Sequence, residues 1–135
     1  MLRILGIDPG VGRVGWGVLT KNDGRMHAQA WGRIDTEKSL PLADRLKSIA
    51  TELHTLIRRY KPKVVAVEKI FFAKNVKTAM DVAHARGVIL LIAAQQKKII
   101  VEYTPMQVKQ ALTGYGNAEK RQVQHYECVR GWSRQ

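Results

Sequence analysis

Residues 3–20 read RILGIDPGVGRVGWGVLT, and this stretch decides the fold. Two apolar segments, 3–8 and 14–20, are typical of buried strands, and the glycine-rich residues between them favour a turn. The first segment ends in Asp8, which is followed by Pro9 and Gly10. A carboxylate at the end of a buried strand is costly unless it pairs with a base, accepts hydrogen bonds or binds a cation. The stretch therefore predicts two paired strands and a carboxylate that needs a role.

The rest of the chain alternates strands and helices. The residues NDG at 22–24 predict a hairpin turn into a third strand over 26–36. From Pro41, a residue suited to a first helical position, apolar side chains recur every three or four residues as far as Tyr60, which predicts an amphipathic helix. Residues 64–68, VVAVE, are typical of a central parallel strand that ends at Glu68.

Further elements complete an α/β pattern. We expect a helix over about 75–96, a strand over 99–104, a short helix over 105–112 and a last helix capped by Asn117. On the 75–96 helix, one face carries Val76, Met80, Ala83, Gly87, Leu91 and Ala94, with Gly87 allowing close packing. The order predicts one domain with a mixed five-stranded sheet and helices on both of its faces.

The charge of the chain points to a polyanionic partner. Its 135 residues hold 23 Lys and Arg against 11 Asp and Glu, a formal net charge of +12. Such an excess favours nucleic acid, with an anionic membrane surface as the weaker alternative. Much of the excess is local, because residues 58–77 carry seven bases against the single acid Glu68. We expect this basic patch to bring a phosphodiester to the acidic residues.

The first and fourth strands can lie side by side in this topology, which brings Asp8 and Glu68 together. Two neighbouring carboxylates repel each other unless a cation lies between them, and oxygen ligands suit Mg²⁺ or Mn²⁺. Metal-dependent cleavage of a phosphodiester follows from that arrangement beside basic residues. From the residues alone a second interpretation stays equally open: Asp8 caps the Pro-Gly turn, and Glu68 pairs with Lys69 or another base.

Four sequence strings resemble the RuvC family of bacterial Holliday-junction resolvases. They are ILGIDPG near the start, VEKIFFAKN at 67–75, ARGV at 85–88 and VKQALTGYGNAEKRQVQ at 108–124. The resemblance implies a ribonuclease-H-like domain over 1–125, a homodimer, and Mg²⁺-dependent symmetrical nicking of four-way DNA junctions in recombination and repair, with two ions in each complete site. It also implies work alongside the RuvA and RuvB branch-migration proteins. By matching position, Asp8 and Glu68 are catalytic metal-binding acids, and the DNA-binding residues are Phe71, Lys109 and Lys120.

The sequence departs from the family after about His125. Residues 126–135 form an atypical tail, in which Glu127 is the only acid, whereas the family's last helix supplies further acids to the metal site. Because of this departure, a second function remains an alternative: a junction-binding protein with impaired catalysis. A less favoured alternative is a phosphate-binding domain of the actin-like ATPases, because GIDPGVGRVGWGV also resembles their first phosphate loop, although those proteins enclose ATP with two such domains.

The remaining features indicate the compartment. Cys128 is the only cysteine, which favours a reducing environment. The sequence shows no signal segment and no apolar run of the length that crosses a membrane. We therefore expect a cytoplasmic protein with no membrane contact. The four histidines are scattered through different elements and have no metal-ligand spacing.

Overall fold

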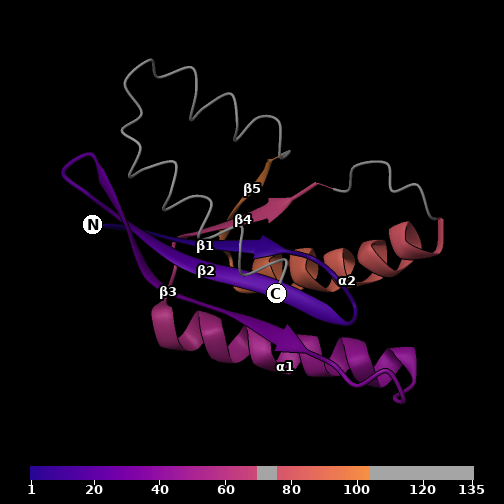
Figure 1. Ribbon diagram of the computed structural model, residues 1–135. Helices are drawn as coiled ribbons and strands as arrows, with labels where there is room; N and C mark the ends of the chain where they lie inside the picture. Colours follow the sequence, from indigo (N-terminus) through magenta and orange to yellow (C-terminus); the bar gives the residue numbers. More distant parts are fainter. Residues whose placement is uncertain (70–75, 104–135) are drawn as a thin grey trace.

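The computed structural model describes residues 1–69 and 76–103. These residues form one mixed sheet in the strand order β3-β2-β1-β4-β5, with two helices (Figure 1). The elements in chain order are β1 (Leu2–Asp8), β2 (Arg13–Asn22), β3 (Arg25–Asp35), α1 (Leu42–Tyr60), β4 (Val64–Glu68), α2 (Val76–Gln95) and β5 (Ile99–Tyr103). The predicted five-stranded mixed sheet is confirmed.

The first three strands form an antiparallel meander, as the glycine-rich and NDG turns predict. Asp23 and Gly24 make the β2–β3 turn with φ of 52° and 76°, between the paired residues Asn22 and Arg25. Positive φ at both central positions is the geometry that matches the twist of a two-residue hairpin, and aspartate followed by glycine is a preferred pair there. The hairpin is long, with an irregularity in register between Val18 and Leu19.

Helix α1 covers the sheet with one apolar face. It begins at Leu42, one residue later than expected, because Pro41 serves as the N-cap and its carbonyl accepts the N–H groups of Asp44 and Arg45. It ends at Tyr60, and the C-cap residue Lys61 adopts the left-handed conformation (φ 47°) and donates its N–H to the Ile57 carbonyl. Arg3 of β1 also donates to the Tyr60 carbonyl at 3.2 Å, which ties the helix end to the sheet.

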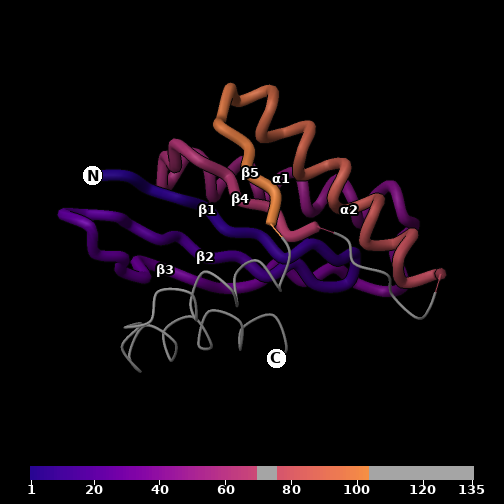
Figure 2. The backbone as a smooth tube through the Cα atoms, turned by 90° about the horizontal axis from the view of Figure 1, so that it is seen from above, coloured from indigo at the N-terminus to yellow at the C-terminus, as the bar shows by residue number. Residues whose placement is uncertain are grey.

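Both described helices lie on the same side of the sheet (Figure 2). The core between them and the sheet consists of apolar side chains that alternate along the strands, such as Leu5 and Ile7 of β1 and Val65 and Val67 of β4. From the helices it takes Ile49, Leu53, Leu56 and Ile57 of α1, and Ala85, Ile89, Ile92 and Ala93 of α2. Because strand side chains alternate, the even-numbered residues of β1 and β4 point to the opposite face.

Several sequence predictions concern residues outside the described ranges. They are the helices expected over 105–112 and after Asn117, and the tail at 126–135. No helix in the described part is both long and apolar enough to cross a membrane.

The apolar stripe that the sequence shows on the second helix does not face the sheet. Val76, Met80 and Leu91 are 74%, 59% and 57% exposed, whereas the neighbouring positions Ala85 and Ile89 are buried. Helix α2 is therefore apolar on two faces, one in the core and one on the surface. Gly87 lies within the outer stripe, and a Cβ atom added there would meet nothing within 4 Å.

Candidate active site

Asp8 and Glu68 lie next to each other on the sheet. They are the last residues of β1 and β4, which pair in parallel with Ile7 opposite Val67. Neighbouring strands are about 4.8 Å apart, and residues at equivalent register share a face. Ile7 and Val67 are buried on the helix side, so Asp8 and Glu68, each one residue further on, point to the opposite side. The proximity expected from the sequence is confirmed.

The backbone after Asp8 is held in place from several directions. Val11 is only 5% exposed and anchors the loop in the core. Thr36, just after β3, donates its hydroxyl to the Val11 carbonyl and its N–H to the Gly12 carbonyl (3.1 Å), while Arg45 Nε of α1 donates to the same hydroxyl at 3.0 Å. These bonds join the turn that follows the carboxylate to β3 and α1, which fixes the position of Asp8.

Gly10 is required by the close packing of this turn. A Cβ atom at residue 10 would lie 2.4 Å from the Arg13 carbonyl oxygen, a separation that real side chains do not show. The turn can therefore fold back on itself only with glycine at this position. In the DPG motif, the backbone of the turn therefore requires the glycine, while the aspartate supplies the carboxylate.

The Glu68 side of the site rests on the outer strand β5. Glu68 pairs with Tyr103, and the N–H of Lys69 donates to the Tyr103 carbonyl at 2.7 Å. The pairing continues to the last residue of β4, so the backbone that carries Glu68 is held on both sides, by β1 and by β5. Both carboxylates therefore stand on strand ends rather than on loops, which favours a fixed separation.

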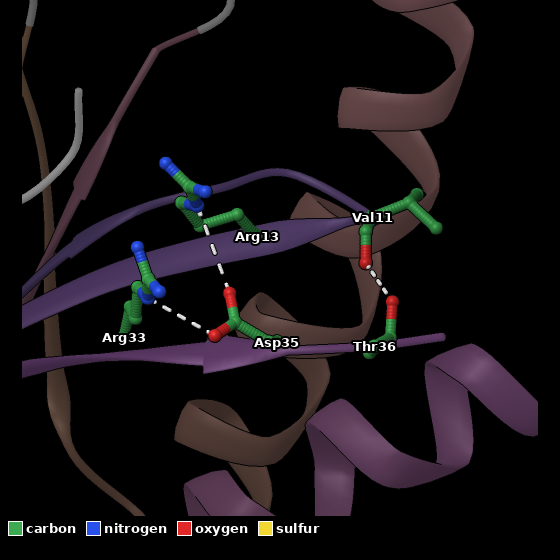
Figure 3. Close-up of polar contacts among 5 residues, drawn as sticks. All are labelled: Val11, Arg13, Arg33, Asp35 and Thr36. Atoms are coloured by element: carbon green, nitrogen blue, oxygen red, sulfur yellow. Dashed lines mark hydrogen bonds and ion pairs between the residues drawn. The ribbon is translucent and has the colours of Figure 1, made fainter. Parts of the chain in front are cut away.

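A charged cluster that the sequence analysis did not single out is formed by Arg13, Arg33 and Asp35 (Figure 3). It lies on the same face of the sheet as Asp8. Asp35 accepts ion pairs from Arg13 Nε at 3.6 Å and from Arg33 Nε at 3.0 Å. Gly15 pairs with both Asp8 and Arg33, so this arginine lies two strands from the carboxylate, about 10 Å away along the row. The arginine side chains are 40% and 42% exposed, which leaves them accessible to a phosphate. The signal in the sequence is the alternation of Trp31, Arg33 and Asp35 with Gly32 and Ile34 along β3.

The described bases of the run at 58–77 do not form one patch in the structure. Arg58, Arg59, Lys61 and Lys63 come before β4 and lie at its beginning, whereas Glu68 is at its end. The expectation that these four bases flank the acidic pair is wrong, because the strand between them carries the chain across the sheet. Of the described bases in the run, Lys69 and Lys77 lie at the Glu68 end.

The structure leaves the other expected site residues untested. Phe71, Lys109 and Lys120 lie outside the described ranges. Within residues 1–69 and 76–103 no group of three or more His, Cys, Asp or Glu side chains is placed to hold a metal ion. The described donors are the paired carboxylates of Asp8 and Glu68, and their all-oxygen chemistry fits Mg²⁺ or Mn²⁺.

A mixed sheet of order 3-2-1-4-5 with acids at the ends of its two central parallel strands defines a class: the ribonuclease-H-like resolvases and their relatives. Solved structures agree. The structure titled T. thermophilus RuvC in complex with Holliday junction substrate superposes with a TM-score of 0.76 at 30% identity, covering 83% of this chain and 70% of that one. The yeast mitochondrial Holliday junction resolvase has the same fold, with a TM-score of 0.67 at 16% identity over 97% of this chain and 62% of that one.

The family follows from the sequence comparisons. The family model described as crossover junction endodeoxyribonuclease RuvC matches residues 4–129. The crossover junction endodeoxyribonuclease RuvC of Petrotoga mobilis is 53% identical over 121 residues, 90% of this chain and 74% of the relative. That of Brevibacillus brevis is 51% identical over 123 residues, 91% and 74% of the two chains. The chain belongs to the RuvC family of crossover junction endodeoxyribonucleases.

Proposed function

We propose that this protein is a metal-dependent endonuclease that nicks four-way DNA junctions symmetrically in recombination and repair, with Asp8 and Glu68 as its catalytic acids. Membership of the RuvC family supports the reaction class. The observation that carries the residue assignment is the placement of both carboxylates on one face, at the ends of adjacent parallel strands.

In the proposed mechanism, Asp8 and Glu68 would hold Mg²⁺ through their carboxylate oxygens. A divalent cation supplies two things when bound: a more acidic water as nucleophile, and stabilisation of the negative charge on the leaving oxygen. The sheet contributes a fixed spacing between the two carboxylates. The Thr36 and Arg45 bonds keep the turn after Asp8 from shifting, so the Asp8 oxygens keep their position while DNA binds.

Basic and aromatic residues position the DNA in this proposal. Arg13 and Arg33 share one carboxylate, so the cluster with Asp35 keeps a net positive charge next to the acidic pair. Guanidinium groups bind phosphate oxygens through paired N–H donors. By resemblance to the family, Phe71 contacts the junction centre, where a ring can wedge against unstacked bases, and Lys109 and Lys120 approach the scissile phosphate.

The proposal includes a homodimer, because two symmetrical cuts need two active sites. Its interface is the exposed stripe of α2 defined by Val76, Met80, Ala83, Gly87, Leu91 and Ala94. An exposed apolar stripe on a helix marks a protein contact, and Gly87 lets a second helix approach closely. RuvA and RuvB, the branch-migration proteins, are the further partners that the family resemblance implies.

The test is cleavage of a synthetic four-way junction by the purified chain in the presence and absence of Mg²⁺. Wild type should nick two opposing strands only with the metal. Asp8→Asn and Glu68→Gln should each reduce the rate at least about 100-fold, since a lost metal ligand removes several kcal/mol of stabilisation of the transition state. Both variants should still bind the junction. Arg45→Lys is an additional control for folding around Asp8, with thermal melting as its readout.

Two results would contradict the proposal. Cleavage that persists at the wild-type rate in Asp8→Asn would remove this carboxylate from the reaction. Junction binding by wild type without any Mg²⁺-dependent cleavage would favour the alternative of a binding protein with impaired catalysis, which the unusual residues 126–135 keep open.

A further inference from the structure

The basic residues that the structure describes are distributed unevenly between the two ends of the sheet. The end where β1, β4 and β5 begin also receives the β2–β3 turn and the last turn of α1 (Figure 1). Besides Arg3, whose guanidinium donates to the Tyr60 carbonyl, eight Lys and Arg residues gather there, against Asp23 as the one acid in the described part of that end. We call them the far-end basic surface: Lys21, Arg25, Arg58, Arg59, Lys61, Lys63, Lys97 and Lys98.

The backbone pairing shows that these residues are neighbours although they come from separate parts of the sequence. Lys21 lies opposite Leu2, and the N–H of Lys63 donates to the Arg3 carbonyl. The Lys63 carbonyl in turn accepts the N–H of Ile99, the residue after Lys98, at 3.1 Å. All of them are exposed except Lys98, which is partly exposed. The surface therefore runs across the whole end of the sheet.

Charges nearly balance at the other end, where the candidate active site lies. Seven acids and eight bases occur there within the described ranges: Asp8, Asp35, Glu37, Asp44, Glu68, Asp81 and Glu102, with Arg13, Arg33, Lys38, Arg45, Lys47, Lys69, Lys77 and Arg86. No ion pair between described residues involves the far-end basic surface, whereas Arg13, Arg33 and Arg86 are paired. The unneutralised charge of the described fold is thus concentrated away from the acidic pair.

Distance excludes a direct role of this surface at the scissile phosphate. Lys63 and Glu68 are five strand residues apart, about 17 Å. At physiological salt, charges are screened over about 8 Å, so the surface acts only on phosphates that it contacts itself. A span of about 17 Å corresponds to about five base-pair steps of 3.4 Å along a duplex. A second stretch of the same DNA can therefore lie against the far end while a strand occupies the active site.

We infer that the far-end basic surface is a second DNA-binding surface, which holds the phosphate backbone of a duplex arm about five base pairs from the point of cleavage. The inference rests on the proposed function for the identity of the polyanion. Lysine and arginine side chains on flexible stems, drawn from three chain segments, suit sequence-independent contact with phosphates. An acidic protein is the competing partner, and it is an outcome of the test.

The experiment compares two variants with equal loss of charge. Lys63→Gln/Lys97→Gln removes two charges from the far end, and Lys38→Gln/Lys47→Gln removes two exposed charges elsewhere. Dissociation constants for a four-way junction and for a linear duplex are measured at several salt concentrations. Each lost phosphate contact lowers the slope of log Kd against log salt by about 0.9, so the far-end variant should lose about 1.8 and the control variant much less.

Cleavage by the same variants separates this inference from the proposed function. At low salt and saturating protein, the far-end variant should cut the junction at the wild-type rate, because its substitutions lie far from Asp8 and Glu68. An unchanged salt slope in the far-end variant, or an equal change in the control variant, would overturn the inference whether or not the protein cleaves. Loss of cleavage in Asp8→Asn, together with a lowered salt slope in the far-end variant, would support the two assignments independently.

Discussion

Gly10→Ala tests whether the turn after Asp8 fixes the active site. The added Cβ atom would lie 2.4 Å from the Arg13 carbonyl oxygen, and ordinary contacts begin at 3.4 Å, so the turn must open by about 1 Å. Overpacking of this kind costs about 1–3 kcal/mol. A cost of about 2 kcal/mol lowers the melting temperature of a domain of this size by about 6–8 °C. A displacement of about 1 Å at a catalytic group reduces a rate by about 100-fold.

Gly12→Ala is the matched control, two residues away in the same turn. Its Cβ atom would lie 3.3 Å from a terminal guanidinium nitrogen of Arg45, which is the flexible end of a side chain and can move aside. We expect a melting temperature close to that of wild type and nearly full junction cleavage. The reasoning fails if Gly10→Ala melts and cleaves as wild type does, or if both variants lose the same stability. Loss of activity without loss of stability would place the effect in the geometry of Asp8 alone.

Two further predictions concern the hydrogen bonds and the outer face of α2. Thr36→Val removes the hydroxyl that bonds to the Val11 carbonyl and to Arg45. In chemical denaturation this variant should lose about 1–3 kcal/mol of its free energy of unfolding. The control is Thr51→Val, whose hydroxyl bonds to the Lys47 carbonyl of its own helix, and this variant should lose much less. Equal losses in the two would show that the Thr36 bonds contribute nothing special. Leu91→Glu should convert the dimer to a monomer in sedimentation experiments. It should not lower the stability of the monomer, because Leu91 is 57% exposed. The control is Leu40→Glu, at a surface position that is 39% exposed, and it should leave association unchanged. A dimer that survives Leu91→Glu would move the interface elsewhere.

The sequence predicts the strands and the acidic pair well, because both depend on local patterns and on one rule of topology. Leu5 and Ile7 alternate with small or polar residues within one strand, and VVAVE is apolar enough to identify a central strand. Once these two strands are taken as parallel neighbours, their carboxyl ends must meet. Asp8 and Glu68 follow from that step without any knowledge of side-chain packing.

The outer face of α2 shows what the sequence alone leaves undecided. Ala85 and Ile89 are buried against the sheet, while Met80 and Leu91, equally apolar, are exposed. Periodicity identifies a helix but cannot choose between two apolar faces, because the choice depends on how the helix rotates against its neighbours. The Arg13–Asp35–Arg33 cluster was missed for a related reason. Its members meet only through the pairing of β2 with β3, and the register of a long hairpin depends on its turn and its irregularities.

The basic run at 58–77 shows the converse limit of sequence-based prediction, because residues that are close in sequence can be distant in the fold. A helix can keep a run of charges together on one surface, but a strand advances about 3.3 Å with every residue. Five residues of β4 therefore separate Lys63 from Lys69 by most of the width of the domain. The same topology brings Lys63 next to Lys98, 35 positions further along the chain. Net charge indicates a polyanionic partner for this fold, but only the strand order shows that the excess charge of the described residues gathers at the end of the sheet opposite the acidic pair.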